Sequence, residues 1–317
     1  MSTTSEKLNS SQGILASPTL ILCGMVWATL ALLFFLVPNI TQPGNEDLPM
    51  WYSIGTYVFG WIANLTAGIL CLRNWRSSQI ISGRTVWLAL GIGMLSYFVG
   101  DLFFASWELI WNLEPDVSLG DVCYIISYIG LIWGMVLAVL SKRVDLRIGE
   151  WGILVAIAAV GVALAFWISV SPDGGAVEAA SETAAIATSE TASSSAPAAI
   201  LALDDLLSQY ADYVGLLYVV LDVFLLIVPT ALLLAFWGGR FSQSWQIIAA
   251  GTFSLYIADM WFRYADGRLE SYQSGNLLEV FWVFTPVLFG IAAVLEYHIS
   301  TRPRQSRRKR RVAATES

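Results

Sequence analysis

Trp87-LALGIGMLSYFVG-Asp101-LFFASW-Glu108, followed after a polar loop by Ser118-LG-Asp121-VCYIISYIGLIWGMVLAV, is a stretch that the chain contains twice. A shift of 158 residues aligns it with a second copy, and no gap is needed. In both copies two apolar segments carry carboxylates at facing ends. The pattern predicts a duplicated helical hairpin. The aligned pairs are Trp87 with Trp245, Gly93 with Gly251, Ser96 with Ser254, Asp101 with Asp259, Glu108 with Asp266, Leu119 with Leu277 and Asp121 with Glu279.

The composition indicates an integral membrane protein. Of the 317 residues, 56% are hydrophobic and 13% are charged, whereas soluble domains are about 45–50% apolar and about 25% charged. A bilayer core of about 30 Å needs roughly 20 apolar residues in a helix. The sequence therefore predicts an all-α integral membrane protein with eight transmembrane helices. Their expected ranges are 18–38, 50–72, 86–111, 121–141, 151–170, 214–237, 245–263 and 277–298.

Basic residues are confined to alternate loops. Segments 39–49, 112–120 and 171–213 contain no Lys or Arg, and only Arg263 and Arg268 break the alternation. The tail after the last span holds seven of the 17 basic residues. Because basic loops stay on the cytoplasmic side, we expect a multi-pass protein of the cell membrane with both termini in the cytoplasm.

The duplication divides the expected membrane domain, 18–298, into two parallel four-helix repeats, because an even number of spans gives both halves the same orientation. The support is clear for the third and fourth spans of each half. It is weaker for the second, where Trp75 and Trp237 match only with a small gap. The low-complexity exterior loop 171–203 has two interpretations. It is either a sensor or docking segment, or a tolerated insertion. The expected parts are a cytoplasmic tail 1–17, repeat one 18–141, repeat two 151–298 with the loop 171–203, and a basic cytoplasmic tail 299–317.

Among the carboxylates inside predicted spans, four stand out: Asp101, Glu108, Asp222 and Asp259. Ionisable groups there are costly and indicate functional sites. Glu108 lies two helical turns beyond Asp101 on the same face, and Asp266 repeats this position in the second half. Together with Arg263, these are the candidates for handling a ligand or an ion.

Arg263 follows Asp259 by one helical turn and is the expected partner of that carboxylate, whereas the corresponding position in the first half is Ala105. For Asp101 the candidate partners are Ser96, Tyr97 and Tyr128, or the other repeat. The matched acids have two interpretations. Either they join helices structurally, or they handle a ligand, ion or proton.

A second acidic pair, Asp121 and Glu279, opens the fourth and eighth spans. Ser118 and Asn276 precede them by three residues, which is the spacing of a capping box. Carboxylates are also favoured at helix N-termini by the helix dipole. We expect this pair to fix the helix starts, which is a structural role.

Several classes of function are excluded by absences in the sequence. The three cysteines lie inside apolar spans, and the single histidine, His298, cannot form a multi-histidine metal or haem site. The last span has no lysine for covalent retinal, and no nucleophile–base motif is present, so a non-enzymatic protein is predicted. The basic tail is too short for a nucleic-acid-binding module; no cofactor is identified, and the bilayer is the expected partner.

The run Glu114-PDVSLGDVCYIISYIGLIWG resembles the multi-span membrane modules that precede diguanylate cyclase and phosphodiesterase domains in bacteria. The residues that carry this resemblance are Pro115, Ser118, Leu119, Asp121, Tyr124 and Tyr128, with Asn276, Leu277 and Glu279 in the second copy. It implies a sensory module of the bacterial inner membrane. Here only a basic tail follows the last span, so any output is expected to pass to a separate signalling partner.

These observations favour a sensory, signal-input or scaffold protein that binds an apolar ligand or a membrane partner. The alternative is a secondary transporter or channel that uses intramembrane carboxylates for proton or cation coupling. A water-accessible cavity at Asp101 and Asp259 would favour the alternative.

Overall fold

The computed structural model describes residues 17–41, 48–111, 113, 117–141, 148–169, 196–235, 242–266, 268 and 274–315. Regular secondary structure in this part of the chain is entirely helical, which confirms the all-α prediction. Most of the low-complexity loop 171–203 and the terminal segment 1–16 lie outside the described residues. So do the loop bases Lys142, Arg143, Arg147 and Arg240.

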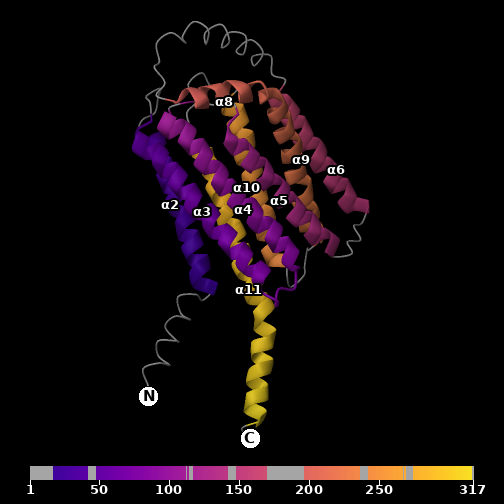
Figure 1. The fold of residues 1–317 in the computed structure, drawn as a ribbon. Coiled ribbons are helices and arrows are strands. Elements are labelled where there is room, and N and C mark those ends of the chain that lie inside the picture. Colours follow the sequence, from indigo (N-terminus) through magenta and orange to yellow (C-terminus); the bar gives the residue numbers. More distant parts are fainter. Residues whose placement is uncertain are drawn as a thin grey trace, which may run out of the picture.

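The helices form an elongated bundle, and α8 lies across one end of it (Figure 1). The π-turn η1 extends α4, and the short 3₁₀ turn η2 leads into α11. The elements are α2 Ser17–Thr41, α3 Met50–Arg76, α4 Arg84–Ala105, η1 Ser106–Ile110, α5 Leu119–Ser141, α6 Ile148–Ser169, α8 Ala198–Ser208, α9 Ala211–Ala235, α10 Ser242–Asp266, η2 Leu277–Glu279 and α11 Val280–Thr315.

Within the described residues, seven helices are long and apolar enough to cross a membrane: α2, α3, α4 with η1, α5, α6, α9 and α11. The chain is therefore a multi-pass helical membrane protein. The predicted span 245–263 corresponds to α10, which is not among the seven. Polar residues such as Ser254, Asp259 and Arg263 lower its apolar content. Much of α10 is buried among α9, α11 and their neighbours, so its polar groups lie inside the bundle.

Close packing of α4 on α5 relies on glycine. A β-carbon placed on Gly130 would lie 3.0 Å from the carbonyl oxygen of Ala89 and 3.2 Å from the Cα of Gly93. Small residues at such crossings let two backbones approach closely, which is a common source of helix association in membranes. The α4–α5 contact thus depends on the missing side chain at position 130.

Two tryptophans from aligned positions meet in the core. Trp87 on α4 and Trp245 on α10 are both buried, and their ring centroids are 6.0 Å apart. The surrounding core is built from α3, α4, α5, α9, α10 and α11. By contrast, α6 packs mainly on α9 and exposes large apolar side chains, as a lipid-facing helix would.

Replacing Gly130 by Val should lower the free energy of unfolding by about 1–3 kcal/mol, because the new side chain collides with backbone atoms of α4. Denaturant titration of the purified protein in micelles measures the effect. Gly152→Val on α6 is the matched control, since nothing lies within 4 Å of its added β-carbon. Equal stabilities of the two variants would contradict the close packing.

Candidate functional site

Asp101 on α4 joins three helices of the first half. Its Oδ1 accepts a hydrogen bond from the Tyr124 hydroxyl of α5 at 2.9 Å. Its Oδ2 accepts one from the Asn64 side-chain amide of α3 at 3.2 Å. The tyrosine partner lies one turn before the Tyr128 expected from the sequence. Each oxygen of the carboxyl group therefore has a side-chain donor, and the acid is held from two neighbouring helices.

Asp259 on α10 is held in the corresponding way. Its Oδ1 accepts a hydrogen bond from the Trp282 indole N–H of α11 at 2.8 Å. Its Oδ2 accepts one from the Tyr128 hydroxyl of α5 at 2.6 Å. Tyr128 belongs to the first half of the chain, so this bond connects the two halves through a buried carboxyl group.

The shift of 158 residues relates the partners as well as the acids. It carries Tyr124 to Trp282, and both donate a hydrogen bond to the acid of their own half. It also carries Asn64 of α3 to Asp222 of α9. The shift therefore also relates α3 to α9, and it does so without the gap that aligning Trp75 with Trp237 requires.

Arg263 forms its ion pair with Asp222, not with Asp259 one turn earlier on its own helix. Its guanidinium lies 3.0 Å from Asp222 Oδ2 and also donates to the Gly215 carbonyl oxygen at 3.3 Å. Both acceptors belong to α9, which packs directly on α10. The helix–helix contact therefore decides the pairing, and intrahelical spacing does not.

Asp222 is fully buried. Its Oδ1 has no partner in hydrogen-bonding geometry among the described groups, although the carboxyl of Asp259 and the hydroxyl of Tyr128 lie beside it. Two carboxyl groups therefore lie together beside one guanidinium, which is paired with Asp222 alone, in a bundle where charge is costly to bury.

A chain of aromatic side chains connects this cluster to Asp121. The Tyr218 hydroxyl of α9 donates to Asp121 Oδ1 at 2.8 Å. The Tyr218 ring lies 5.5 Å from that of Tyr128, and the Arg263 guanidinium lies over it at 5.9 Å. Asp121 thus has contacts beyond the capping role expected from the sequence.

Asp121 and Glu279 make corresponding contacts at the starts of α5 and η2. Asp121 Oδ2 accepts from the Ser118 backbone N–H at 2.7 Å. Glu279 accepts from the backbone N–H groups of Gly275 at 2.7 Å and of Asn276 at 3.2 Å. These bonds satisfy donors that precede a helix.

The two outermost acids differ in what the structure describes. Glu108 lies in η1, and it accepts a hydrogen bond from the Tyr57 hydroxyl of α3. Asp266 is the last residue of α10, and its side chain lies outside the described part.

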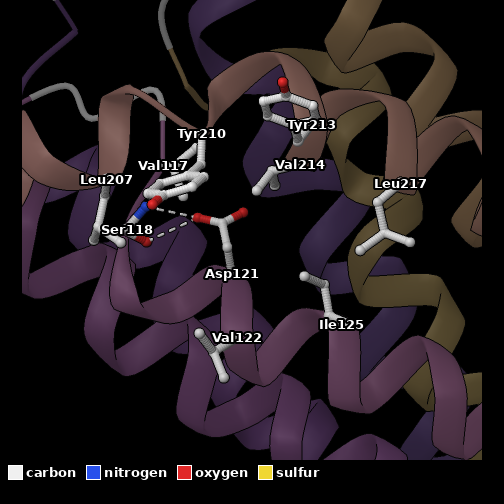
Figure 2. Close-up of a pocket in the computed structure, with 10 residues that line it drawn as sticks. All are labelled: Val117, Ser118, Asp121, Val122, Ile125, Leu207, Tyr210, Tyr213, Val214 and Leu217. Atoms are coloured by element: carbon white, nitrogen blue, oxygen red, sulfur yellow. Dashed lines mark hydrogen bonds between the residues drawn. The ribbon is translucent and has the colours of Figure 1, made fainter.

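An apolar groove of about 300 Å³ lies beside Asp121 (Figure 2). Asp121 on α5 and Ser118 just before this helix are polar members of one wall, and Tyr210 and Tyr213 come from the opposite wall. Ligand pockets are typically concave and mostly apolar with a few placed polar groups, and this groove fits that description. The residues lining it are Val117, Ser118, Asp121, Val122, Ile125, Leu207, Tyr210, Tyr213, Val214 and Leu217.

Sequence reasoning missed the groove and several members of the network. The groove has no sequence signal, because α5 meets α8 and α9 only in the fold. Asn64 was detectable, since the 158-residue shift places it on Asp222. Glu296 was missed too; it is fully buried on α11, where the Ser300 hydroxyl lies 3.4 Å from its Oε1. A carboxylate within a span is itself a signal.

Metal binding has no support in the described part of the chain, where no three His, Cys, Asp or Glu side chains form a group suited to a metal ion. Searches against protein-family profiles, curated proteins and solved structures gave no match to this chain. The function must therefore be inferred from the site itself.

Replacing Tyr128 by Phe should lower the free energy of unfolding by about 1 kcal/mol, because Asp259 Oδ2 loses its donor inside the bundle. Denaturant titration in micelles measures the change. Tyr213→Phe is the control, since this side chain is 73% exposed. A Tyr128→Phe variant as stable as the control would show that the link between the halves contributes nothing.

Proposed function

We propose that the chain is a non-enzymatic sensory or signal-input protein of the membrane that binds an apolar ligand in the groove beside Asp121. The observation that carries the proposal is the position of this groove. It lies where Asp121 receives the Tyr218 hydroxyl, so it adjoins the polar network of the bundle. A ligand there has a direct contact through which it can change the network.

The ligand that suits the groove is a single hydrocarbon chain with a polar end, taken up from the bilayer. The volume of about 300 Å³ is at the lower end of the range of about 300–1,000 Å³ for ligand pockets. Val122, Tyr213 and Leu217 are exposed at its edge, on helices that contact lipid in a membrane. The carboxyl of Asp121 and the hydroxyls near it provide the contacts for a polar end.

The network offers a route from the groove to the centre of the bundle. Asp121 is bonded to Tyr218, whose ring contacts Tyr128, and Tyr128 donates to Asp259. Asp259 in turn accepts from Trp282 on α11, the helix that continues into the basic tail. A partner that contacts the tail would receive the signal.

The transporter or channel alternative has less support at Asp101 and Asp259. Each of these acids already accepts two hydrogen bonds from side chains of neighbouring helices. A coupling group must instead exchange partners with a transported ion. The side chains that donate these hydrogen bonds instead hold both acids in a connected network, in which a change at one member affects the others.

For the topology we propose eight spans in two parallel halves, with α10 as the seventh in order. Support comes from its length of 25 residues, from its packing against α9 and α11, and from the polar partners related by 158 residues. The alternation of basic loops favours cytoplasmic termini. The resemblance to bacterial sensory modules favours the inner membrane.

A photoactivatable fatty acid tests the groove. With the full chain in lipid nanodiscs, we expect cross-links within 117–125 and 207–217, mapped by peptide mass spectrometry. Val214→Trp should reduce this labelling several-fold, because the indole fills the groove. The control is Val155→Trp, on an exposed position of α6. Labelling spread over all lipid-facing helices, and unchanged by Val214→Trp, would reject the groove as a ligand site.

Proteoliposomes separate a sensor from a transporter. The sensor proposal predicts no proton or sodium flux above that of empty liposomes, measured with entrapped ion-sensitive dyes. The double variant Asp101→Asn, Asp259→Asn should insert into the membrane but lose the proposed sensory function, because both buried acids of the network are changed. Flux that the wild type supports and the double variant lacks would favour the transporter.

A further inference from the structure

We propose that Asp222, Asp259 and Arg263 form a binding site for one exchangeable proton, and that only the second half of the chain carries this site. The proposal concerns the interior of the bundle and does not depend on a ligand in the groove. It assigns distinct roles to the two matched acids, Asp101 and Asp259, which the sequence presents as equivalent.

The charges of the cluster are not balanced. Arg263 is paired with Asp222 at 3.0 Å, which leaves the carboxyl group of Asp259 without a cation of its own. With both acids ionised the cluster has a net charge of −1, in an interior where such a charge is costly. Uptake of one proton forms an O–H bond on one carboxyl group and makes the cluster neutral. Two acids this close do not both remain ionised easily.

The geometry provides a place for that proton. Asp222 is fully buried, and its Oδ1 lacks a partner in hydrogen-bonding geometry among the described groups. The carboxyl of Asp259 lies beside it. A protonated acid at either position can donate to the other, which uses the unpartnered oxygen. Both oxygens of Asp259 also accept hydrogen bonds from Tyr128 and Trp282.

The first half of the chain has neither the second acid nor the base of this cluster. The residue aligned with Asp222 is Asn64, and the one aligned with Arg263 is Ala105. Asn64 is a neutral donor, and it gives a hydrogen bond to Asp101 at 3.2 Å. The second half thus has both an acid, Asp222, and a base, Arg263, that the first half lacks. They pair with each other, and the acid is a second carboxyl group beside Asp259.

In the described part of the chain, the other titratable or hydrogen-bonding side chains around the two acids are tyrosines and a tryptophan. They come from α4, α5, α9, α10 and α11, and α6 packs behind this group with apolar residues such as Ile157. Arg263 is therefore the cation that faces the pair in the described structure. The titratable or hydrogen-bonding neighbours are Tyr97 on α4, Tyr128 on α5, Tyr218 on α9, Tyr256 on α10 and Trp282 on α11.

Aromatic contacts extend from the cluster toward the groove. The rings of Tyr128 and Tyr218 are 5.5 Å apart, and the Tyr218 hydroxyl is bonded to Asp121 at 2.8 Å. Asp121 lines the groove. Proton release would leave a charge beside Tyr128, the residue that connects the two halves.

Infrared difference spectroscopy of the full chain in nanodiscs, recorded between acidic and alkaline pH, tests the proposal. We expect a C=O band of a protonated carboxylic acid that disappears at alkaline pH. Asp222→Asn and Asp259→Asn should each remove the same band, because one proton is shared by both groups. The double variant should lose no more than either single variant. Two separate bands, one lost in each variant, would overturn the shared site.

A variant that copies the first half guards against simple misfolding. Asp222→Asn with Arg263→Ala recreates the set Asn64, Asp101 and Ala105, which the same fold already accommodates. We expect it to fold with wild-type thermal stability and to show a carboxylic acid band from Asp259, which then has no cation beside it. Asp222→Asn alone should lack the band, because Arg263 then neutralises Asp259. The matched variant Asp101→Asn should keep the band. A copied set that folds and lacks the band, or an Asp101→Asn variant that loses it, would contradict the proposal.

Discussion

The bundle depends on the burial of carboxyl groups that neighbouring helices must satisfy. A buried acid without partners is far less stable than one with donors on both oxygens, so α3, α5 and α11 are held against α4 and α10 by what Asp101 and Asp259 require. The requirement is directional. A hydrogen bond from Tyr124, Tyr128 or Trp282 fixes the rotation of its helix, which apolar packing alone leaves less defined in lipid.

The two matched acids differ in the residues that surround them. Asn64 and Asp222 are aligned, as are Ala105 and Arg263, and the two changes form an ion pair in the second half. The acid alone would add a second uncompensated carboxyl group to the interior of the bundle. The two together are tolerated, and they convert a satisfied structural acid into a member of a cluster with an excess carboxyl group.

The groove and the acid cluster are two ends of one connected structure. Asp121, whose local role is to order the start of α5, also receives Tyr218 from α9. Tyr218 lies between this outer contact and the ring of Tyr128. In the proposed sensory function a ligand in the groove would act through this link, since a ligand acts only through contacts that differ between states. Trp282 connects the acid cluster to α11.

The sequence by itself determined the membrane class and the helical segments, and it singled out Asp101, Asp259 and their aligned neighbours, because hydropathy and a repeated spacing are local properties of a chain. The predicted seventh span corresponds to α10, whose polar residues reflect burial among other helices and reduce its apolar signal. Only the tertiary structure decided that Arg263 pairs with Asp222, that Tyr128 reaches the other half, and that α5, α8 and α9 enclose a groove. These contacts depend on how helices rotate and pack, and residues far apart in sequence carry no local mark of meeting.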